Sequence, residues 1–178
     1  METLLLISSI FLWPVVGINL LLTVALIRRQ QKTAKRPEML PVGAEAPPFT
    51  AETPAGEKVT LADFNGEGQL ALVFVSPTCT PCLKKIPFFN NLYPAARRAG
   101  VELILVSDSD REATRSFVAE HEVALPVLAA PRSANPFLEQ YKVMGTPTYY
   151  LLDRAHKVKS AGFLDGEWHE FTVEWIAA

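Results

Sequence analysis

The only two cysteines of this 178-residue chain, Cys79 and Cys82, are separated by two residues. They follow an apolar run at residues 70–75 that is typical of a buried strand, and they precede apolar residues at helical spacing, Leu83 and Ile86. A helix N-terminus has unpaired N–H groups and a partial positive charge, so it lowers the pKa of a cysteine there. We therefore predict redox chemistry, in which the Cys79 thiolate attacks a disulfide and Cys82 resolves the mixed disulfide.

The residues next to the cysteines fit this prediction. Pro81 suits the first helical turn, where its missing N–H costs nothing, and Lys84 and Lys85 add positive charge near the thiols. The alternative is a metal site, but zinc takes four ligands and the chain has no second cysteine pair. The histidines, at positions 121, 156 and 169, show no ligand spacing. We predict neither a metal nor another cofactor beyond the dithiol itself.

The charge is close to balanced, with a net value of −2, but basic residues gather at residues 28–36. The rest of the chain has no basic stripe interleaved with aromatic residues, so nucleic-acid binding is not predicted. Residues 4–27 are apolar and uncharged, and such a helix would rise ~36 Å, enough for a ~30 Å hydrocarbon core. A cleaved signal peptide is the alternative, although no basic residue precedes the apolar run. We predict a transmembrane anchor at 4–27, a basic and then proline-rich linker at 28–45, and one domain at 46–178.

Strand and helix patterns alternate through this domain. A hairpin is expected over residues 46–61, and strands are expected at 70–75, 101–106, 126–129, 143–153 and 156–162. Helices are expected from Cys82 to residue 98, at 111–122, from the Asn135–Pro136 cap to Tyr141, and at 166–178. Pro87 should kink the first helix. This order predicts an α/β fold with a partly parallel sheet and helices on its faces. Reactive groups in such sheets lie at the carboxyl ends of strands, where Cys79 falls.

From residue 41 onward the chain resembles the thioredoxin superfamily, in its membrane-anchored branch of TlpA- and ResA-like thiol-disulfide oxidoreductases. The segments that carry the resemblance are Pro-Val-Gly-Ala-Glu-Ala-Pro-Pro-Phe at 41–49 with Val-Thr-Leu-Ala-Asp-Phe at 59–64, Ser-Pro-Thr-Cys-Thr-Pro-Cys at 76–82, Pro87, and Gly145-Thr146-Pro147. The resemblance implies a thioredoxin-like fold and a dithiol at Cys79 and Cys82. It also implies that Pro87 is the proline that kinks the helix.

The same resemblance implies a substrate site beside the cysteines. Pro147 would be a cis proline facing the disulfide, and the backbone of Thr146 would pair with the substrate chain. The groove would be rimmed by Met144, Tyr149 and Pro77. The alternative for Pro147 is an ordinary proline at the start of a strand. The Thr80–Pro81 dipeptide resembles the reducing members of the family more than the strong oxidants.

Partners also follow from the resemblance. It implies a disulfide-containing protein substrate and a membrane electron donor of the DsbD or CcdA type. The apolar opening and the Ser-Pro-Thr-Cys phrase at 76–79 are similar to MauD-like accessory proteins, so the substrate class is a cytochrome c or a methylamine-dehydrogenase-type protein undergoing maturation. The family implies a bacterial inner-membrane protein with its domain on the periplasmic side. Basic residues after the anchor favour the cytoplasmic side instead, so the topology stays open.

Three departures from the family pattern leave out the usual groups that shuttle a proton to Cys82, so either water does this work or the protein reduces slowly and selectively. Thr78 replaces the usual tryptophan, Val73 replaces a buried acid, and Lys85 stands where a carboxylate often follows the second cysteine. Two other functions remain as alternatives. A redoxin-type peroxidase would have proline and threonine where Leu72 and Ser76 stand, and a Cu(I) carrier would show a wider cysteine spacing with a histidine.

Overall fold

The computed structural model describes residues 12–25, 39–64, 66 and 68–164. The chain divides into two units, Met1–Glu38 and Met39–Ala178. In the first unit, residues 12–25 are helical and their large apolar side chains are exposed. Among the described residues, no helix combines the length and the apolar character needed to cross a membrane. The helix predicted at 166–178 lies outside the described residues.

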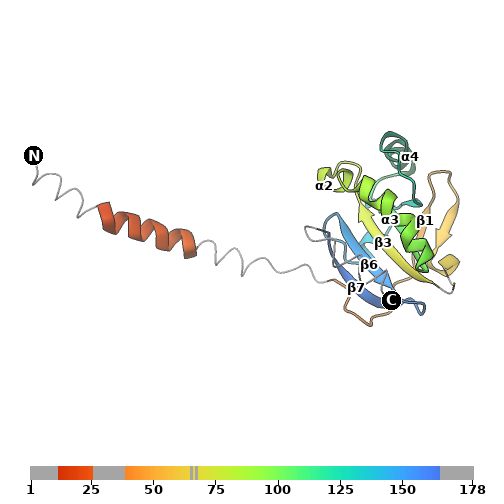
Figure 1. The fold of residues 1–178 in the computed structure, drawn as a ribbon, viewed down its shortest axis with the longest axis horizontal. Coiled ribbons are helices and arrows are strands. Elements are labelled where there is room, and N and C mark those ends of the chain that lie inside the picture. The colour runs from red at the N-terminus through yellow and green to blue at the C-terminus, as the bar shows by residue number, and fades with distance from the viewer. Residues whose placement is uncertain (1–11, 26–38, 65, 67, 165–178) are drawn as a thin grey trace, which may run out of the picture. The chain divides into compact units, whose positions relative to one another are not determined.

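A mixed seven-stranded sheet forms the centre of the second unit in the described part of the chain, in the order β2-β1-β5-β4-β3-β6-β7 (Figure 1). The strands are β1 Thr50–Glu52, β2 Lys58–Thr60, β3 Gln69–Val75, β4 Val101–Ser107, β5 Val127–Ala129, β6 Thr148–Leu152 and β7 Val158–Phe163. β4 pairs in parallel with β3 and β5, whereas the other pairs are antiparallel. The predicted α/β fold with a partly parallel sheet is confirmed.

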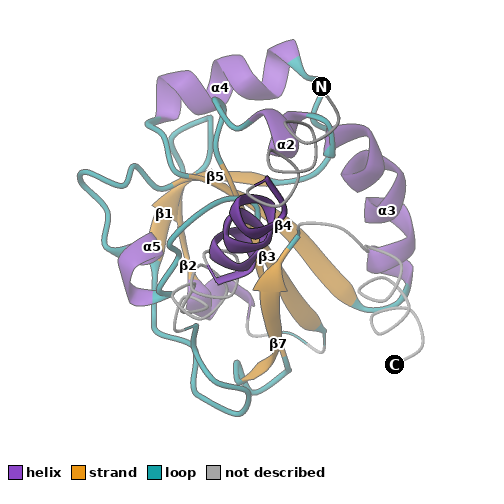
Figure 2. Cartoon of the chain, turned by 90° about the vertical axis from the view of Figure 1, so that its left-hand side faces the viewer, coloured by secondary structure: helices purple, strands orange, loops and turns teal. Residues whose placement is uncertain are grey.

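Helices cover both faces of this sheet (Figure 2). They are the 3-10 helix η1 Leu61–Phe64 and the α-helices α2 Thr80–Leu83, α3 Ile86–Arg98, α4 Arg111–Glu120 and α5 Phe137–Gln140. β3 is buried on both sides, as its continuous apolar sequence predicts. One face, with Val73 and Val75, packs with α3 and α4, and the other, with Leu72 and Phe74, packs with α5. The rigid β3 therefore fixes where the cysteine segment begins.

Most expected elements differ from the structure by only one or two residues at their ends, but two differ by more. The helix expected to run from Cys82 to residue 98 is interrupted at Lys84 and Lys85, between α2 and α3. Pro87 lies in the first turn of α3, where it needs no N–H partner, so the helix restarts there instead of bending. The strand expected at 143–153 begins only at Thr148, because the carbonyl groups of Val143 and Gly145 accept hydrogen bonds from side chains instead of from a neighbouring strand.

Two buried tyrosines fasten the segment before β1 to the domain. The Tyr141 hydroxyl donates to the carbonyl of Pro47 at 2.9 Å, and the Tyr150 hydroxyl donates to the carbonyl of Tyr141 at 2.6 Å. The Leu40 N–H in turn donates to the Tyr150 hydroxyl at 3.2 Å. Burial raises the pKa of both phenols above the ordinary value of 10.0.

Candidate active site

Cys79 and Cys82 form a disulfide at the carboxyl end of β3. Cys79 is the N-cap of α2, and the Cys82 N–H donates to Cys79 Sγ at 3.3 Å. Cys79 is partly exposed, whereas Cys82 is buried with 0% of its surface accessible. An N–H in this position is one that would stabilise a thiolate at the N-cap of a helix. Only the Cys79 side of the bond is open to attack from solvent.

A second segment meets the disulfide from β6. The peptide bond between Thr146 and Pro147 is cis, which confirms the cis prediction over the ordinary strand-start proline. The Thr146 carbonyl oxygen lies 3.5 Å from Cys79 Sγ. Pro147 is buried and Thr146 is partly exposed. The structure thus brings together the two segments that the sequence predicted to form one site.

The loop at residues 143–147 is held by hydrogen bonds to three residues outside it. Its carbonyl oxygens accept from Arg132 Nη1 at Val143 (3.0 Å), from Thr148 Oγ1 at Gly145 (2.6 Å) and from the Leu164 N–H at Pro147 (3.0 Å). The Arg132 N–H also donates to the Asp108 carbonyl at 3.0 Å, which ties the loop to the end of β4. Sequence reasoning missed Arg132 and Leu164, since no local pattern marks a side chain or an N–H whose partner lies in a distant loop.

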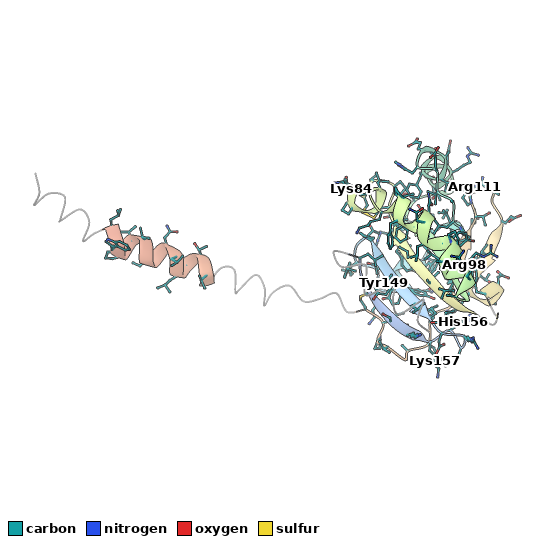
Figure 3. The ribbon with its side chains drawn as sticks, viewed as in Figure 1. Lys84, Arg98, Arg111, Tyr149, His156 and Lys157 are labelled. Atoms are coloured by element: carbon teal, nitrogen blue, oxygen red, sulfur yellow. A yellow bond between two sulfur atoms is a disulfide. The ribbon has the colours of Figure 1, made fainter. Side chains whose placement is uncertain are left out.

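The other predicted site residues surround the disulfide along the chain. They are Pro77, half-buried before Cys79, Thr80 and Pro81, exposed in the first turn of α2, Lys85, half-buried between α2 and α3, and Pro87, exposed at the start of α3. Lys84 lies directly after α2, and Tyr149 lies on the neighbouring strand β6 (Figure 3). Within the described residues, no group of three or more His, Cys, Asp or Glu side chains is placed to hold a metal ion.

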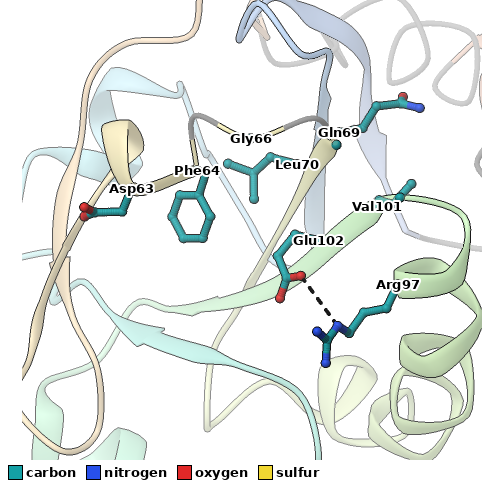
Figure 4. A pocket seen from close by; sticks show the side chains of 10 residues that line it. Asp63, Phe64, Gly66, Gln69, Leu70, Arg97, Val101 and Glu102 are labelled. Atoms are coloured by element: carbon teal, nitrogen blue, oxygen red, sulfur yellow. Dashed lines mark ion pairs between the residues drawn. The ribbon is translucent and has the colours of Figure 1, made fainter.

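A separate surface pocket lies at the opposite end of the parallel strands (Figure 4). Gln69 and Val101, which begin β3 and β4, line this pocket. Arg97 Nε faces Glu102 Oε2 there at 3.9 Å. Because Cys79 follows the other end of β3, this pocket is not part of the candidate active site.

A dithiol at the carboxyl end of the sheet, with one sulfur buried and the other against a cis-proline loop, defines a thioredoxin-like thiol-disulfide oxidoreductase. Residues 42–161 match the model of the AhpC/TSA family. The chain is 36% identical over 122 residues to the thiol-disulfide oxidoreductase ResA of Bacillus thuringiensis subsp. konkukian, covering 68% of this chain and 69% of that protein. The chain therefore belongs to the AhpC/TSA family, among its ResA-like thiol-disulfide oxidoreductases.

Solved structures agree with this assignment. The thioredoxin domain of a thiol-disulfide oxidoreductase from Bacteroides vulgatus is 26% identical with a TM-score of 0.65, and the match covers 76% of this chain and 96% of that domain. A candidate thiol:disulfide interchange protein DsbE from Chlorobium tepidum is 26% identical with a TM-score of 0.66, over 78% and 99% of the two chains. The predicted fold and the predicted enzyme class are both confirmed.

Proposed function

We propose that this protein reduces or isomerises disulfides in a specific apoprotein, with Cys79 as the nucleophile and Cys82 as the resolving thiol. The observation that carries the proposal is the asymmetry of the pair. Cys79 is partly exposed and lies 3.5 Å from the Thr146 carbonyl, whereas Cys82 is fully buried beneath it.

The reaction begins with the reduced dithiol. The Cys79 thiolate attacks one sulfur of the substrate disulfide, which forms the mixed disulfide and releases the other substrate sulfur as a thiolate. Cys82 then loses its proton and attacks the Cys79 sulfur, which closes the intramolecular disulfide and releases the second substrate sulfur. In total the dithiol gives the substrate two electrons, and the substrate takes up two protons: one that Cys82 loses and one from solvent, which received the Cys79 proton when the thiolate formed. An external dithiol must then reduce the enzyme for the next cycle.

Substrate binding in this proposal uses the backbone beside the disulfide. The extended backbone of the substrate pairs with Thr146, next to Pro147, and Pro77 borders the same groove. Thr80 and Pro81 shape the first turn of α2, and Lys85 adds positive charge where the thiolate forms. Pro87 starts α3, whose buried residue Ile86 packs in the same apolar cluster as Cys82.

The proposal includes a membrane anchor. Residues 4–27 are uncharged, and the helical part at 12–25 exposes its apolar side chains. We place the domain on the periplasmic side of a bacterial inner membrane, where a donor of the DsbD or CcdA type reduces it. The substrate class is a cytochrome c or a methylamine-dehydrogenase-type protein. Labelling of Cys79 by a membrane-impermeant maleimide in intact, reduced cells tests the side, and protection until lysis would contradict it.

The direction of electron flow can be measured as a reduction potential. A value near that of thioredoxin, about −270 mV, is expected for a reductant, and a value near −120 mV would mark an oxidant and contradict the proposal.

The decisive experiment compares the two cysteine variants. Cys82→Ser cannot resolve the mixed disulfide, so it should accumulate a covalent complex with substrate that dithiothreitol releases. Cys79→Ser should form no such complex and should have no turnover, because Cys82 is buried. Substrate turnover by Cys79→Ser, or equal trapping by both variants, would overturn the assigned roles.

A further inference from the structure

Met144 is an exposed apolar side chain in the loop at 143–147, whose Thr146 carbonyl meets the disulfide. Among the described residues of the Met39–Ala178 unit, Met144 and Val42 are the large hydrophobic side chains that are exposed, at 74% and 73%. Met144 is two residues before Thr146, so their Cα atoms are at most ~7 Å apart. The Thr146 carbonyl itself lies 3.5 Å from Cys79 Sγ. Met144 therefore belongs to the loop that meets the Cys79 side of the disulfide.

The backbone around Met144 is fixed while its side chain stays in solvent. Val143, directly before it, is buried, and the Val143 carbonyl accepts from Arg132 Nη1 at 3.0 Å. Directly after it, the Gly145 carbonyl accepts from Thr148 Oγ1 at 2.6 Å. A fixed backbone lowers the ordering cost of a contact, and the unbranched thioether adapts to partners of different shape.

We propose that Met144 is a recognition residue that packs against an apolar side chain adjacent to the reactive cysteine of the protein substrate. Arg132 is a positioning residue for this contact, because it holds the carbonyl that precedes Met144. This inference rests on the proposed disulfide reductase function and goes beyond it, because it states which substrate segments the enzyme prefers. The general backbone pairing at Thr146 gives no such preference, since every residue has the same backbone groups.

The test uses two short peptides that differ at one position next to a single cysteine, leucine in one and serine in the other. Each cysteine is linked to glutathione by a disulfide. The reduced full-length protein in detergent donates two electrons to this bond and yields the peptide thiol, glutathione and the Cys79–Cys82 disulfide. We expect the second-order rate constant to favour the leucine peptide about fourfold, the factor for one methylene group leaving water. The preference should appear in the half-saturating concentration of single-turnover reactions rather than in their maximal rate.

Matched variants separate the contact from general effects. Met144→Gln should bring the leucine-to-serine ratio to about one, and Met144→Leu should retain it. Val42→Gln replaces the other exposed apolar side chain and should leave the ratio at its wild-type value. Arg132→Gln should lower the ratio through a higher half-saturating concentration for the leucine peptide, and Arg132→Lys should restore part of it.

Two results would overturn the inference. One is equal rates for both peptides with the wild-type protein, and the other is an unchanged ratio in Met144→Gln. After either result, the wild-type protein is tested with hydroxyethyl disulfide. If it reduces this small disulfide, the proposed reductase function still stands and only the role of Met144 is wrong. If the wild-type protein reduces neither hydroxyethyl disulfide nor either peptide, the reductase function itself fails.

Discussion

Asn90 joins α3 to the turn between α4 and β5, and its removal should destabilise the domain. Its Nδ2 donates to the Glu122 carbonyl at 2.9 Å, and its Oδ1 accepts from the Ala124 N–H at 2.9 Å. Glu122 has a φ of 50°, so the turn adopts a left-handed conformation that this side chain supports. In Asn90→Ala both backbone groups lose their partner. Each net hydrogen bond contributes about 0.5–1.5 kcal/mol, so we expect a loss of about 2 kcal/mol.

The assay is urea unfolding of the domain from Met39, which forms its own unit with its own buried clusters. With an m-value of about 2 kcal/mol/M, the midpoint should fall by about 1 M. Asn91→Ala is the matched control, because Asn91 is the next residue of α3 and is exposed. Both variants gain the same helix propensity, so the difference between them isolates the two hydrogen bonds. Equal midpoints for Asn90→Ala and Asn91→Ala would refute this reasoning.

Three further predictions concern stability. Burial raises the pKa of Tyr141 and Tyr150, so the unfolded chain loses these protons at lower pH than the folded chain does. The free energy of unfolding should therefore decline as the pH rises above 10.0. Tyr150→Phe should flatten that decline in urea titrations at pH 9 to 11, and an unchanged slope would contradict the prediction. Gly162→Ala should lower the thermal midpoint, because a Cβ at Gly162 would lie 2.8 Å from Tyr149 Cε1 across β6 and β7; a midpoint equal to wild type would show that the ring moves aside easily. Asp110 caps the start of α4, where its Oδ1 accepts from the Ala113 N–H at 2.8 Å. Asp110→Ala should lower the free energy of unfolding by about 1 kcal/mol in chemical denaturation, and Asp110→Asn should keep most of that stability. Equal losses in both variants would refute the capping role.

The cysteine site was predictable because its signals are local. An apolar run, a CxxC pair and a helical pattern stand next to each other in the sequence, and each depends on its own residues. The position of Cys79 at the carboxyl end of β3 followed from the alternation of strands and helices. The cis bond before Pro147 came from resemblance to a family, since residue types alone allow a trans proline at a strand start.

The contacts that position the loop at 143–147 were not predictable, because they join distant segments. Arg132 and Leu164 reach the loop from outside it. For the same reason the strand expected from Val143 begins at Thr148, since the carbonyls of Val143 and Gly145 bond to side chains instead of to a neighbouring strand. The break at Lys84 and Lys85 could not be predicted from the apolar residues. Cys82 in α2 and Ile86 in α3 belong to one buried cluster, so their spacing is that of a continuous helix.

The environment of Cys82 limits which group can take its proton. Cys82 shares an apolar cluster with Val73, which stands where many thioredoxins have a buried acid, and both are 0% exposed. Lys85 stands where a carboxylate often occurs in the family, so this position supplies no carboxylate to accept the proton. A thiolate is disfavoured in such surroundings until it reacts. In the proposed reaction, two bases can take the Cys82 proton: water, and the substrate thiolate that the attack of Cys79 releases. If that thiolate takes the Cys82 proton, Cys82 attacks the mixed disulfide faster when the released substrate sulfur stays in the groove. The enzyme would then resolve such substrates faster than those whose released sulfur moves away.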